Sequence, residues 1–430
     1  MISADEKPSP VLGKARDFLW HFGPRCVRLI SGLIGSGAVA RHLGPETFGI
    51  LAFATMVAML ATSLVQLGAL EVLTKATAVN PGQVPSLLRS GLLLRFLGFL
   101  PAAGLIGVAS MWFGHASLYA ILALLPLTLV PDAVEAVFFG KSCFRQTAPV
   151  RTLAAVAGLA ARLFLVAHDA PVEAFAWVTV GEGLLTGLLF LWMGRGLWRG
   201  PDPAQPQNWK KVFCQSLPLA GTALAVGLTL RLDQFILQTL RPGADVGHYL
   251  AVVRMFEMAY VIIPSFLAVL LPDFARWRHL NANEYQLRMI RLYTLTYRWG
   301  FVASCGLALL APWVVPLIFG GAFRPGIPIF MVYAFTLPSF VVGNIRAMDF
   351  VVRDQNIHHL TVILCLLPIQ IPLCWWMVTW AGPVGLALAM VAVTFISTTA
   401  FSLMLPPLRE TGRLQAMALK SLFFSAGTKN

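Results

Sequence analysis

The stretch FGILAFATMVAMLATSLVQLGAL, residues 48–70, contains no charged side chain. A helix of about 20 apolar residues crosses a hydrocarbon core about 30 Å thick, so this stretch is long enough to span a bilayer. Apolar stretches of similar length recur along almost the whole chain. The sequence therefore predicts an all-α polytopic membrane protein.

The overall composition supports this prediction. Of the 430 residues, 57% are hydrophobic and 12% are charged, whereas soluble domains are about 45–50% apolar and about 25% charged. The net charge is +13, but the Lys and Arg residues stand in short clusters between apolar segments, which argues against nucleic acid as a partner. The N-terminal residues lack the features of a secretory signal, so we expect them to stay uncleaved.

About twelve expected spans fall into two groups of six. The first group covers residues 22–40, 48–70, 88–113, 116–139, 152–166 and 174–193. The second group covers residues 213–240, 249–271, 298–319, 327–351, 360–380 and 384–405. We expect an N-terminal lobe at 1–193, a cytoplasmic linker at 194–212, a C-terminal lobe at 213–405 and a cytoplasmic tail at 406–430. Residues 414–426 of the tail are too short to span, and either lie on the membrane surface or are disordered.

The charges in the loops predict the orientation. Most Lys and Arg residues fall on one side of the alternating spans, and the opposite side has Arg41, Arg241 and Arg324. Cytoplasmic loops carry the excess of positive residues, so we expect both termini to be cytoplasmic. The external loops are too short for a catalytic ectodomain. This argues against glycosyltransferases, polysaccharide polymerases and ligases, and we expect no enzyme activity.

A short motif occurs in both halves. LGPETFG at 43–49 ends the first expected hairpin, and LRPGADVG at 240–247 ends the hairpin between the seventh and eighth spans. In both, Pro stops the incoming helix and Gly permits the tight return. Because each half has an even number of spans, the halves share one orientation, which predicts a parallel repeat about an axis along the membrane normal. Two lobes around a central cleft follow from this repeat.

These residues also carry a family resemblance. The runs ARHLGPETFGILAFATMVAML at 40–60, LDQFILQTLRPGADVGHYLAVVRMFEM at 232–258 and LPDFA at 271–275 resemble the O-antigen (Wzx-type) flippases, the polysaccharide-export branch of the multidrug/oligosaccharidyl-lipid/polysaccharide (MOP) superfamily. The resemblance implies two six-helix bundles around a central cavity. It also implies transfer of an undecaprenyl-diphosphate-linked sugar from the inner to the outer leaflet, with polysaccharide polymerases and glycosyltransferases as possible partners.

Five arginines lie inside the expected spans. A charge at the bilayer centre costs roughly 2.5–3.5 kcal/mol on insertion scales, so such residues usually face a protein interior or a wet cavity and mark function. The guanidinium group also binds phosphate well through its planar set of donors. These arginines are Arg95, Arg162, Arg231, Arg254 and Arg346.

Some of these charges have a structural explanation as well. Arg254 and Glu257 are three residues apart, as are Arg346 and Asp349, so each pair can neutralise itself on one helix face. The sequence leaves open whether these are structural pairs or substrate contacts. Arg346 and Asp349 also lie near a span end, where snorkelling reduces the cost, and are the weaker functional candidates.

The resemblance implies that the first, second, seventh and eighth spans line the cavity. Arg231 and Asp233 are two residues apart and point to different sides of their helix, so their partners should lie on another helix. The candidate residues that hold the diphosphate and sugar are Arg25, Arg28, Arg231, Asp233, Arg254 and Glu257.

Three acidic residues in the first half receive other interpretations. Glu182 has no basic residue within one turn of its expected helix, so it is either a packed neutral carboxyl or a site of ion coupling. Asp132 and Glu135 lie near Lys141 and are interpreted as ordinary charges at a span end. No metal is expected, because neither the cysteines nor His358-His359 form a ligand cluster. No cofactor is expected either, and the sequence contains no ATPase module. Energy would come from an ion gradient, the membrane potential or consumption of the flipped lipid.

Two alternatives remain open. An ion-coupled small-molecule or multidrug exporter of the same superfamily would share the fold, although such exporters use acidic cavity residues to bind cations. A non-transporting assembly partner of glycan-synthesis enzymes would leave the arginines in the spans without a role, except as contacts between helices. The sequence does not identify the sugar, the polysaccharide pathway, the energy source or the oligomeric state.

Overall fold

The structure is a computed structural model of the 430-residue chain. It describes residues 10–66, 69–79, 84–141, 143–198, 221, 224–353, 355, 357–404 and 408–424.

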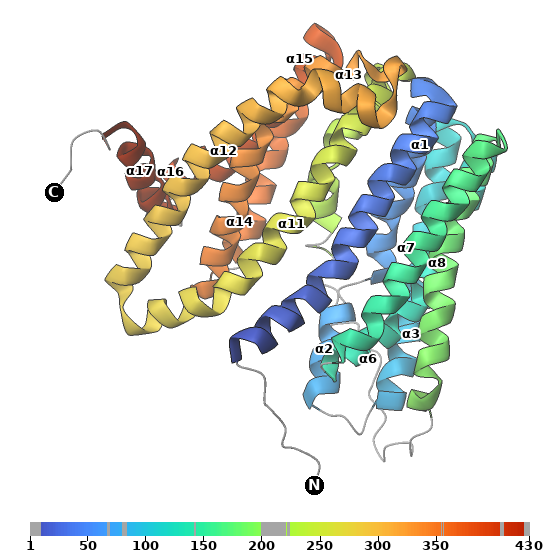
Figure 1. The fold of residues 1–430 in the computed structure, drawn as a ribbon, viewed down its shortest axis with the longest axis horizontal. Coiled ribbons are helices and arrows are strands. Elements are labelled where there is room, and N and C mark those ends of the chain that lie inside the picture. The colour runs from blue at the N-terminus through green and yellow to red at the C-terminus, as the bar shows by residue number, and fades with distance from the viewer. Residues whose placement is uncertain are drawn as a thin grey trace. The chain divides into compact units, whose positions relative to one another are not determined.

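All regular elements in these ranges are helices (Figure 1), which confirms the all-α fold class. Nine of them are long and apolar enough to cross a membrane within the described ranges. Two of the nine contain 41 and 44 residues, Cys26–Gln66 and Thr361–Met404, about twice the length of one crossing. A two-lobe protein of about twelve spans is consistent with these lengths. Most of the expected span at 213–240 precedes Leu232, and its residues 213–220, 222 and 223 lie outside the described ranges.

Both long segments contain a break where the sequence predicts a turn. In α1 (Pro10–Gln66) the backbone leaves the helical region at Gly44, with φ 72° and ψ 171°. In α15 (Ile357–Phe395) it leaves that region at Ala381 and Gly382. Gly44 and Gly382 have positive φ, which glycine adopts without the steric cost of a Cβ. Each segment therefore holds two helical passes.

The chain forms two compact units. Unit 1 takes its described residues from Met1–His42 and Ala54–Gly227, and unit 2 from Leu43–Phe53 and Leu228–Asn430. The turn of the first hairpin thus belongs to unit 2, although the rest of α1 belongs to unit 1. Of the expected linker at 194–212, only residues up to Trp198 are described.

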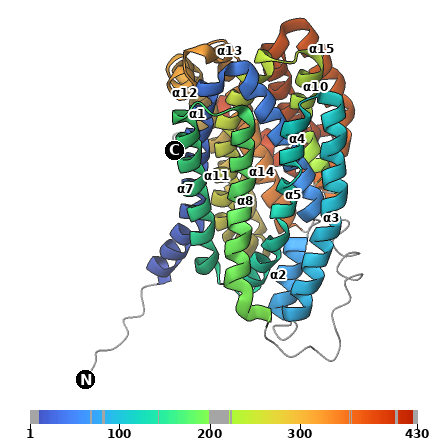
Figure 2. The ribbon, with the colours of Figure 1, turned by 90° about the vertical axis from the view of Figure 1, so that its right-hand side faces the viewer.

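Unit 1 contains long helices beside one broken helix (Figures 1 and 2). The long helices are α3 (Val84–Phe113), α7 (Phe144–Ala167) and α8 (Val172–Gly194), accompanied by the shorter α2 (Ala69–Val79). The expected span 116–139 is divided into α4 (Ala116–Leu122), α5 (Leu125–Thr128), a 3-10 turn (Val130–Asp132) and α6 (Ala133–Gly140). Prolines at 126 and 131 lack the amide donors of a continuous helix, which favours these breaks.

Unit 2 combines long helices with short ones (Figure 1). They are α10 (Leu232–Leu240), α11 (Ala244–Leu280), α12 (Ala282–Phe319), α13 (Gly326–Tyr333), α14 (Thr336–Val352) and α15, followed by a π-helix (Ile396–Ala400) and α16 (Phe401–Met404). α12 starts 16 residues before the expected span at 298–319 and is 38 residues long. At 1.5 Å per residue its length of about 57 Å exceeds the hydrocarbon core.

The two repeated motifs meet inside unit 2. A Cβ at Gly49 would lie 2.8 Å from the backbone nitrogen of Gly247 and 3.2 Å from the carbonyl oxygen of Gly243. A Cβ at Gly247 would overlap the carbonyl oxygen of Pro45. Close contact between two backbones therefore explains the feature that both motifs share, a glycine after the turn.

The C-terminal segment is a packed helix rather than a free tail. α17 (Arg409–Phe424) buries Leu414 and Ala418 in a core cluster that includes Met289 of α12 and Val342 of α14. The Thr294 hydroxyl of α12 lies 3.0 Å from the Ser421 hydroxyl. One face of the amphipathic sequence at 414–426 thus contacts protein, up to the last described residue at 424.

We expect Gly247→Ala to lower the unfolding temperature of the purified protein, because the new methyl group overlaps the Pro45 carbonyl. Overpacking of this kind typically costs about 1–3 kcal/mol. Gly306→Ala in α12 is the matched control, because its Cβ would meet no atom within 4 Å and alanine favours the helix. Equal unfolding temperatures for the two variants would contradict the close contact of the hairpins.

Candidate functional site

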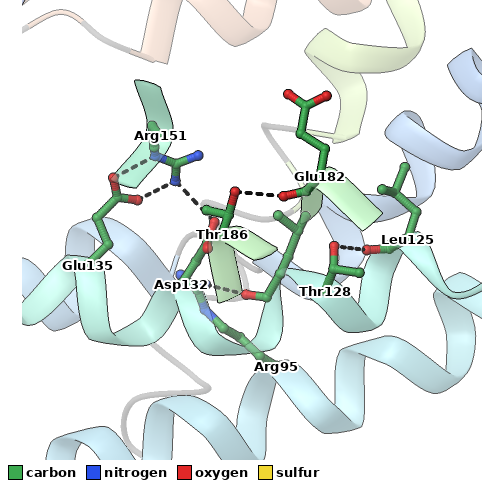
Figure 3. Close-up of polar contacts among 9 residues, drawn as sticks. Arg95, Leu125, Thr128, Asp132, Glu135, Arg151, Glu182 and Thr186 are labelled. Atoms are coloured by element: carbon green, nitrogen blue, oxygen red, sulfur yellow. Dashed lines mark hydrogen bonds and ion pairs between the residues drawn. The ribbon is translucent and has the colours of Figure 1, made fainter. Parts of the chain in front are cut away.

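Unit 1 contains a group of four charged residues, three of them buried and Arg151 partly exposed, at the break in the fourth span (Figure 3). Asp132 ends the 3-10 turn and Glu135 lies in the first turn of α6. Arg151 comes from α7 and Arg95 from α3. Asp132, Glu135 and Arg95 are 8%, 5% and 2% exposed. The interpretation of Asp132 and Glu135 as ordinary end charges is therefore wrong.

Arg151 joins the two carboxylates. Its Nε donates to Glu135 Oε1 at 2.7 Å and its Nη2 donates to Asp132 Oδ2 at 3.1 Å. Nη2 also donates to the second oxygen of Glu135. Such bidentate Arg–carboxylate bonds are strong and directional. Arg151 lies outside the sequence-predicted span at 152–166, so hydropathy gave no reason to connect it with Asp132.

Arg95 is held by the broken helix itself. Its Nη1 donates to the carbonyl oxygen of Leu129 at 2.8 Å, between α5 and the 3-10 turn. α8 approaches this break closely through glycines: a Cβ at Gly187 would lie 3.0 Å from Pro131 and 3.1 Å from the Thr128 carbonyl. The helix break thus brings two acidic and two basic groups together. Their formal charges cancel, as expected for a structural network.

Glu182 forms a separate ion pair. Its Oε2 lies 2.9 Å from Arg162 Nη2 on the neighbouring helix α7, and Figure 3 shows its carboxylate pointing away from Asp132 and Arg151. A Cβ at Gly158 would lie 2.6 Å from the same oxygen, so a side chain at this position would require the Glu182 carboxylate to shift. Ion coupling at Glu182 stays a prediction, and it would require a cation to compete with Arg162.

Arg231 and Asp233 both find partners on α11, as their two-residue spacing predicts. Arg231 Nη1 lies 3.7 Å from Glu257 Oε1, and these side chains are 24% and 36% exposed. The Tyr249 hydroxyl donates to Asp233 Oδ2 at 2.5 Å, and Asp233 is buried. Arg231 and Glu257 thus form a long, partly exposed pair, whereas Asp233 belongs to the core.

Arg254 has a different environment from the other arginines of the spans. Its side chain is half-buried in α11, and across the described residues no hydrogen bond or ion pair connects it to Glu257. Glu257 instead faces Arg231. Of the two alternatives left open by the sequence, the structural pair of Arg254 with Glu257 does not form, and Arg254 is a guanidinium in an apolar segment without a carboxylate partner in the described ranges.

Arg25 and Arg28 lie on the first part of α1. The side chain of Arg25 is outside the described part of the structure, and Arg28 is exposed. Both belong to unit 1, whereas the other four candidate residues belong to unit 2. The structure therefore brings together Arg231, Glu257 and Asp233 on neighbouring elements α10 and α11.

Arg346 and Asp349 also do not pair with each other. Asp349 accepts hydrogen bonds from Tyr285, from Arg353 Nε at 2.7 Å and from Thr411 at 2.6 Å. Arg346 donates to neutral groups near the π-helix instead. The i,i+3 spacing is thus overridden by partners from α12 and α17, which no local pattern could indicate.

The family of this chain follows from its sequence similarity to a family model. A family model described as polysaccharide biosynthesis protein matches residues 15–277, more than half of the chain. This protein belongs to the polysaccharide biosynthesis protein family. No curated protein matches the sequence significantly.

Solved structures share the fold of this family member. The lipid II flippase MurJ in an inward closed conformation has a TM-score of 0.64 and 14% identity, with 96% of this chain and 93% of that chain covered. An inward-facing MATE family multidrug resistance transporter of the MOP superfamily has a TM-score of 0.69 and 14% identity, covering 94% and 99%. An outward-facing MATE structure has a TM-score of 0.63 and 11% identity, covering 93% and 96%. The fold is that of MOP superfamily transporters.

We expect Arg151→Met to destabilise the protein strongly, because it leaves the carboxylates of Asp132 and Glu135 buried without their cation. Removing one partner of a buried ion pair lowers the free energy of unfolding by about 3–5 kcal/mol. The measurement is the unfolding temperature of the purified protein. Combining Arg151→Met with Asp132→Asn and Glu135→Gln should restore most of the loss.

The control for this experiment is Arg241→Met, whose 3.9 Å pair with Asp245 is 46% and 40% exposed. Exposed pairs contribute about 0–1 kcal/mol, so this variant should unfold close to the wild type. An Arg151→Met protein as stable as Arg241→Met would contradict the structural role of the buried group.

Proposed function

We propose that this protein flips an undecaprenyl-diphosphate-linked oligosaccharide from the inner to the outer leaflet of a bacterial inner membrane. The product would serve polysaccharide biosynthesis, as O-antigen, capsule or exopolysaccharide. Membership of the polysaccharide biosynthesis family and a fold shared with a lipid II flippase and with MATE transporters support a transporter. The remaining question is which residues would hold the charged part of such a lipid.

Arg254 carries the proposal. It is a half-buried guanidinium in a membrane-spanning helix, and no acidic side chain of the described residues neutralises it. An unpaired charge at this depth is costly and is retained where it contacts a substrate or a wet cavity. A diphosphate offers several oxygens to the planar donors of arginine. The guanidinium would repel a drug-like cation. This favours a flippase for an anionic lipid over a small-molecule exporter.

Arg231 is the second proposed contact. Its distance of 3.7 Å from Glu257 is longer than a charge-assisted hydrogen bond, and both side chains are partly exposed. A diphosphate could displace Glu257 at low cost because the pair is weak. Arg231 and Arg254 lie in unit 2, one before and one after the repeated turn at 240–247. Arg25 and Arg28 are proposed as further contacts from α1.

The remaining candidate residues take supporting roles in this proposal. Glu257 holds Arg231 in place before substrate arrives. Asp233 fixes α10 to α11 through Tyr249. Both termini are proposed to be cytoplasmic, which places the Lys- and Arg-rich loops on the side where lipid-linked sugars are made. Polymerases and glycosyltransferases that make or extend the glycan are the proposed protein partners.

We expect Arg254→Ala to lower export strongly while the protein accumulates normally, because the residue has no structural partner to lose among the described residues. The measurement uses cells from which the gene is deleted and which carry the wild-type or variant gene on a plasmid. It determines the amount of labelled undecaprenyl-diphosphate sugar on each leaflet. Hydrogen bonds to charged groups contribute about 1.5–3 kcal/mol, so the transport rate should fall by about tenfold or more. Arg324→Ala, an exposed arginine outside the spans, is the control and should export normally.

Arg231→Ala and Glu257→Gln separate a substrate contact from a structural pair. If Arg231 holds substrate, Arg231→Ala loses export whereas Glu257→Gln keeps it, because only the guanidinium contacts phosphate. If the pair is structural, both variants lower export or protein level equally. Unchanged leaflet distribution after deletion of the gene itself would contradict the flippase and favour a small-molecule exporter.

A further inference from the structure

One face of α12 is exposed along most of the helix. Its positions follow one another at intervals of four and seven residues, which keeps them on one side of a helix. Among the nine described segments that can cross a membrane, α12 has the smallest buried share, 17% of its most apolar part. The exposed positions of this face are Leu287, Arg291, Arg298, Val302, Leu309 and Trp313.

The chemistry of this face changes at Trp299. Beyond it the exposed side chains are apolar, and Val302 and Leu309 are 54% and 69% exposed. Before it stand the exposed Arg298 and Arg291. Tryptophan is enriched at the level of the lipid headgroups, and long basic side chains extend to the same layer. Trp299, which is itself 61% exposed, therefore marks the level at which the hydrocarbon core ends.

The C-terminal helix adds a third basic side chain at this level. The Ser421 hydroxyl of α17 lies 3.0 Å from the Thr294 hydroxyl of α12 (Figure 1). Thr294 stands about one helical turn from both Arg291 and Arg298, and Lys420 directly precedes Ser421. The contact therefore brings the exposed Lys420 close to the two arginines.

Protein groups in the described ranges do not compensate these three charges. No ion pair or hydrogen bond among the described residues involves the side chain of Arg291, Arg298 or Lys420. The sequence also has no Asp or Glu within one helical turn of any of them. The neighbouring Arg288 differs, because its Nε donates to Glu284 at 2.6 Å. Three positive charges thus face outward at the end of an apolar stripe.

We infer that Arg291, Arg298 and Lys420 bind the headgroup of an anionic phospholipid. The lipid phosphate would accept hydrogen bonds from the guanidinium and ammonium groups. The acyl chains would lie along the apolar face of α12 beyond Trp299. This face selects a phospholipid over free phosphate, because free phosphate has no apolar part to place there. Anionic lipids also attract basic side chains that lie near the bilayer surface.

The spacing of the three side chains fits one headgroup layer. A bilayer is about 40–45 Å thick with a hydrocarbon core of about 30 Å, which leaves a headgroup layer of about 5–8 Å on each side. Arg291 lies about 10 Å before Arg298 along the helix axis, and Lys420 approaches α12 between them. Because Arg and Lys side chains are long and flexible, all three reach this layer.

The inference does not depend on the proposed export function. Arg231 and Arg254, the proposed contacts of the transported lipid, lie on other parts of unit 2, and a membrane phospholipid is not the cargo. A protein that exports nothing would bind the same phospholipid. Because the ligand would contact both α12 and α17, its binding would also hold the C-terminal helix in place, and the two equilibria are linked.

The test uses the purified full-length protein in neutral detergent, titrated with phosphatidylglycerol or with phosphatidylcholine. Native mass spectrometry gives the number of bound lipids and the affinity for each. We expect phosphatidylglycerol to bind more tightly than phosphatidylcholine. Hydrogen exchange of residues 409–424 should slow with phosphatidylglycerol, and less so at high salt, because salt screens interactions between exposed charges.

The variants Arg291→Gln, Arg298→Gln and Lys420→Gln each remove one charge and keep much of the side chain. Each should weaken phosphatidylglycerol binding by about fivefold, the factor that corresponds to about 1 kcal/mol per basic residue at an anionic surface. Phosphatidylcholine binding should stay the same. The three side chains are exposed, so the variants should unfold at the temperature of the wild type.

The double variant Arg409→Gln/Arg413→Gln is the matched control for Arg291→Gln/Arg298→Gln. It removes the same number of exposed positive charges, and both residues lie on α17 at least about 10 Å from Lys420 along the helix axis. The control should bind phosphatidylglycerol like the wild type. Equal weakening in the two double variants would mean that only the net charge matters, and it would overturn the inference.

Three further outcomes would contradict this site. Equal affinity for phosphatidylglycerol and phosphatidylcholine would show that water alone solvates the three charges. Phosphatidylglycerol binding that none of the three single variants weakens would place the lipid elsewhere. Undecaprenyl phosphate that displaces phosphatidylglycerol at a far lower concentration would make the site a contact for the transported lipid instead.

Discussion

Charge compensation in an apolar interior is the constraint on which the rest of this structure depends. Hydrocarbon offers no partner for a guanidinium or a carboxylate, so each charged group in a span needs one from the protein or from a ligand. The charge of Arg151 is compensated by two carboxylates, and that of Arg162 by Glu182. Arg346 uses backbone carbonyls and a hydroxyl instead. The positions of these partners in turn decide where helices break and where glycines are required.

The irregular backbone of the fourth span illustrates this dependence. The Leu129 carbonyl, between α5 and the 3-10 turn, accepts both the Asp132 amide at 3.1 Å and Arg95 Nη1 at 2.8 Å. Asp132, at the end of the turn, accepts a hydrogen bond from Arg151. Gly187 of α8 then fits against the break because it has no side chain. The same relation holds at Gly158, where the absence of a Cβ leaves space for Glu182 and Arg162.

Sequence patterns predicted what depends on local chemistry. The apolar runs located the spans, and the Pro and Gly of the motif LGPETFG located a hairpin at Gly44. The two-residue spacing of Arg231 and Asp233 correctly placed their partners on another helix. These features follow from helix geometry and from backbone sterics, which a single sequence contains.

Most partners of the buried charges could not be predicted in this way. Local i,i+3 spacing left open whether Arg254 pairs with Glu257 and Arg346 with Asp349, and neither pair forms among the described residues. Asp349 does have a local partner in Arg353, four residues later, but it is also held by Tyr285, 64 residues earlier, and Thr411, 62 residues later. Helix packing decides such long-range pairs, so periodicity along one helix carries no information about them. The role of Arg151 was missed for the same reason.

The arginines of the spans can therefore be ordered by how fully protein groups already compensate their charge. Arg151 makes bidentate bonds to carboxylates that are themselves buried, and replacing those bonds by bonds to a substrate would expose two acids at high cost. Arg231 has one long, partly exposed contact with Glu257, which costs little to exchange. Arg254 has no carboxylate partner in the described part of the chain. A transporter must bind its cargo and release it, so its contacts should come from groups that lose little when the cargo leaves. On that physical ground we propose the arginines with the weakest partners, Arg231 and Arg254, as the functional ones, and depth in the membrane alone does not identify them.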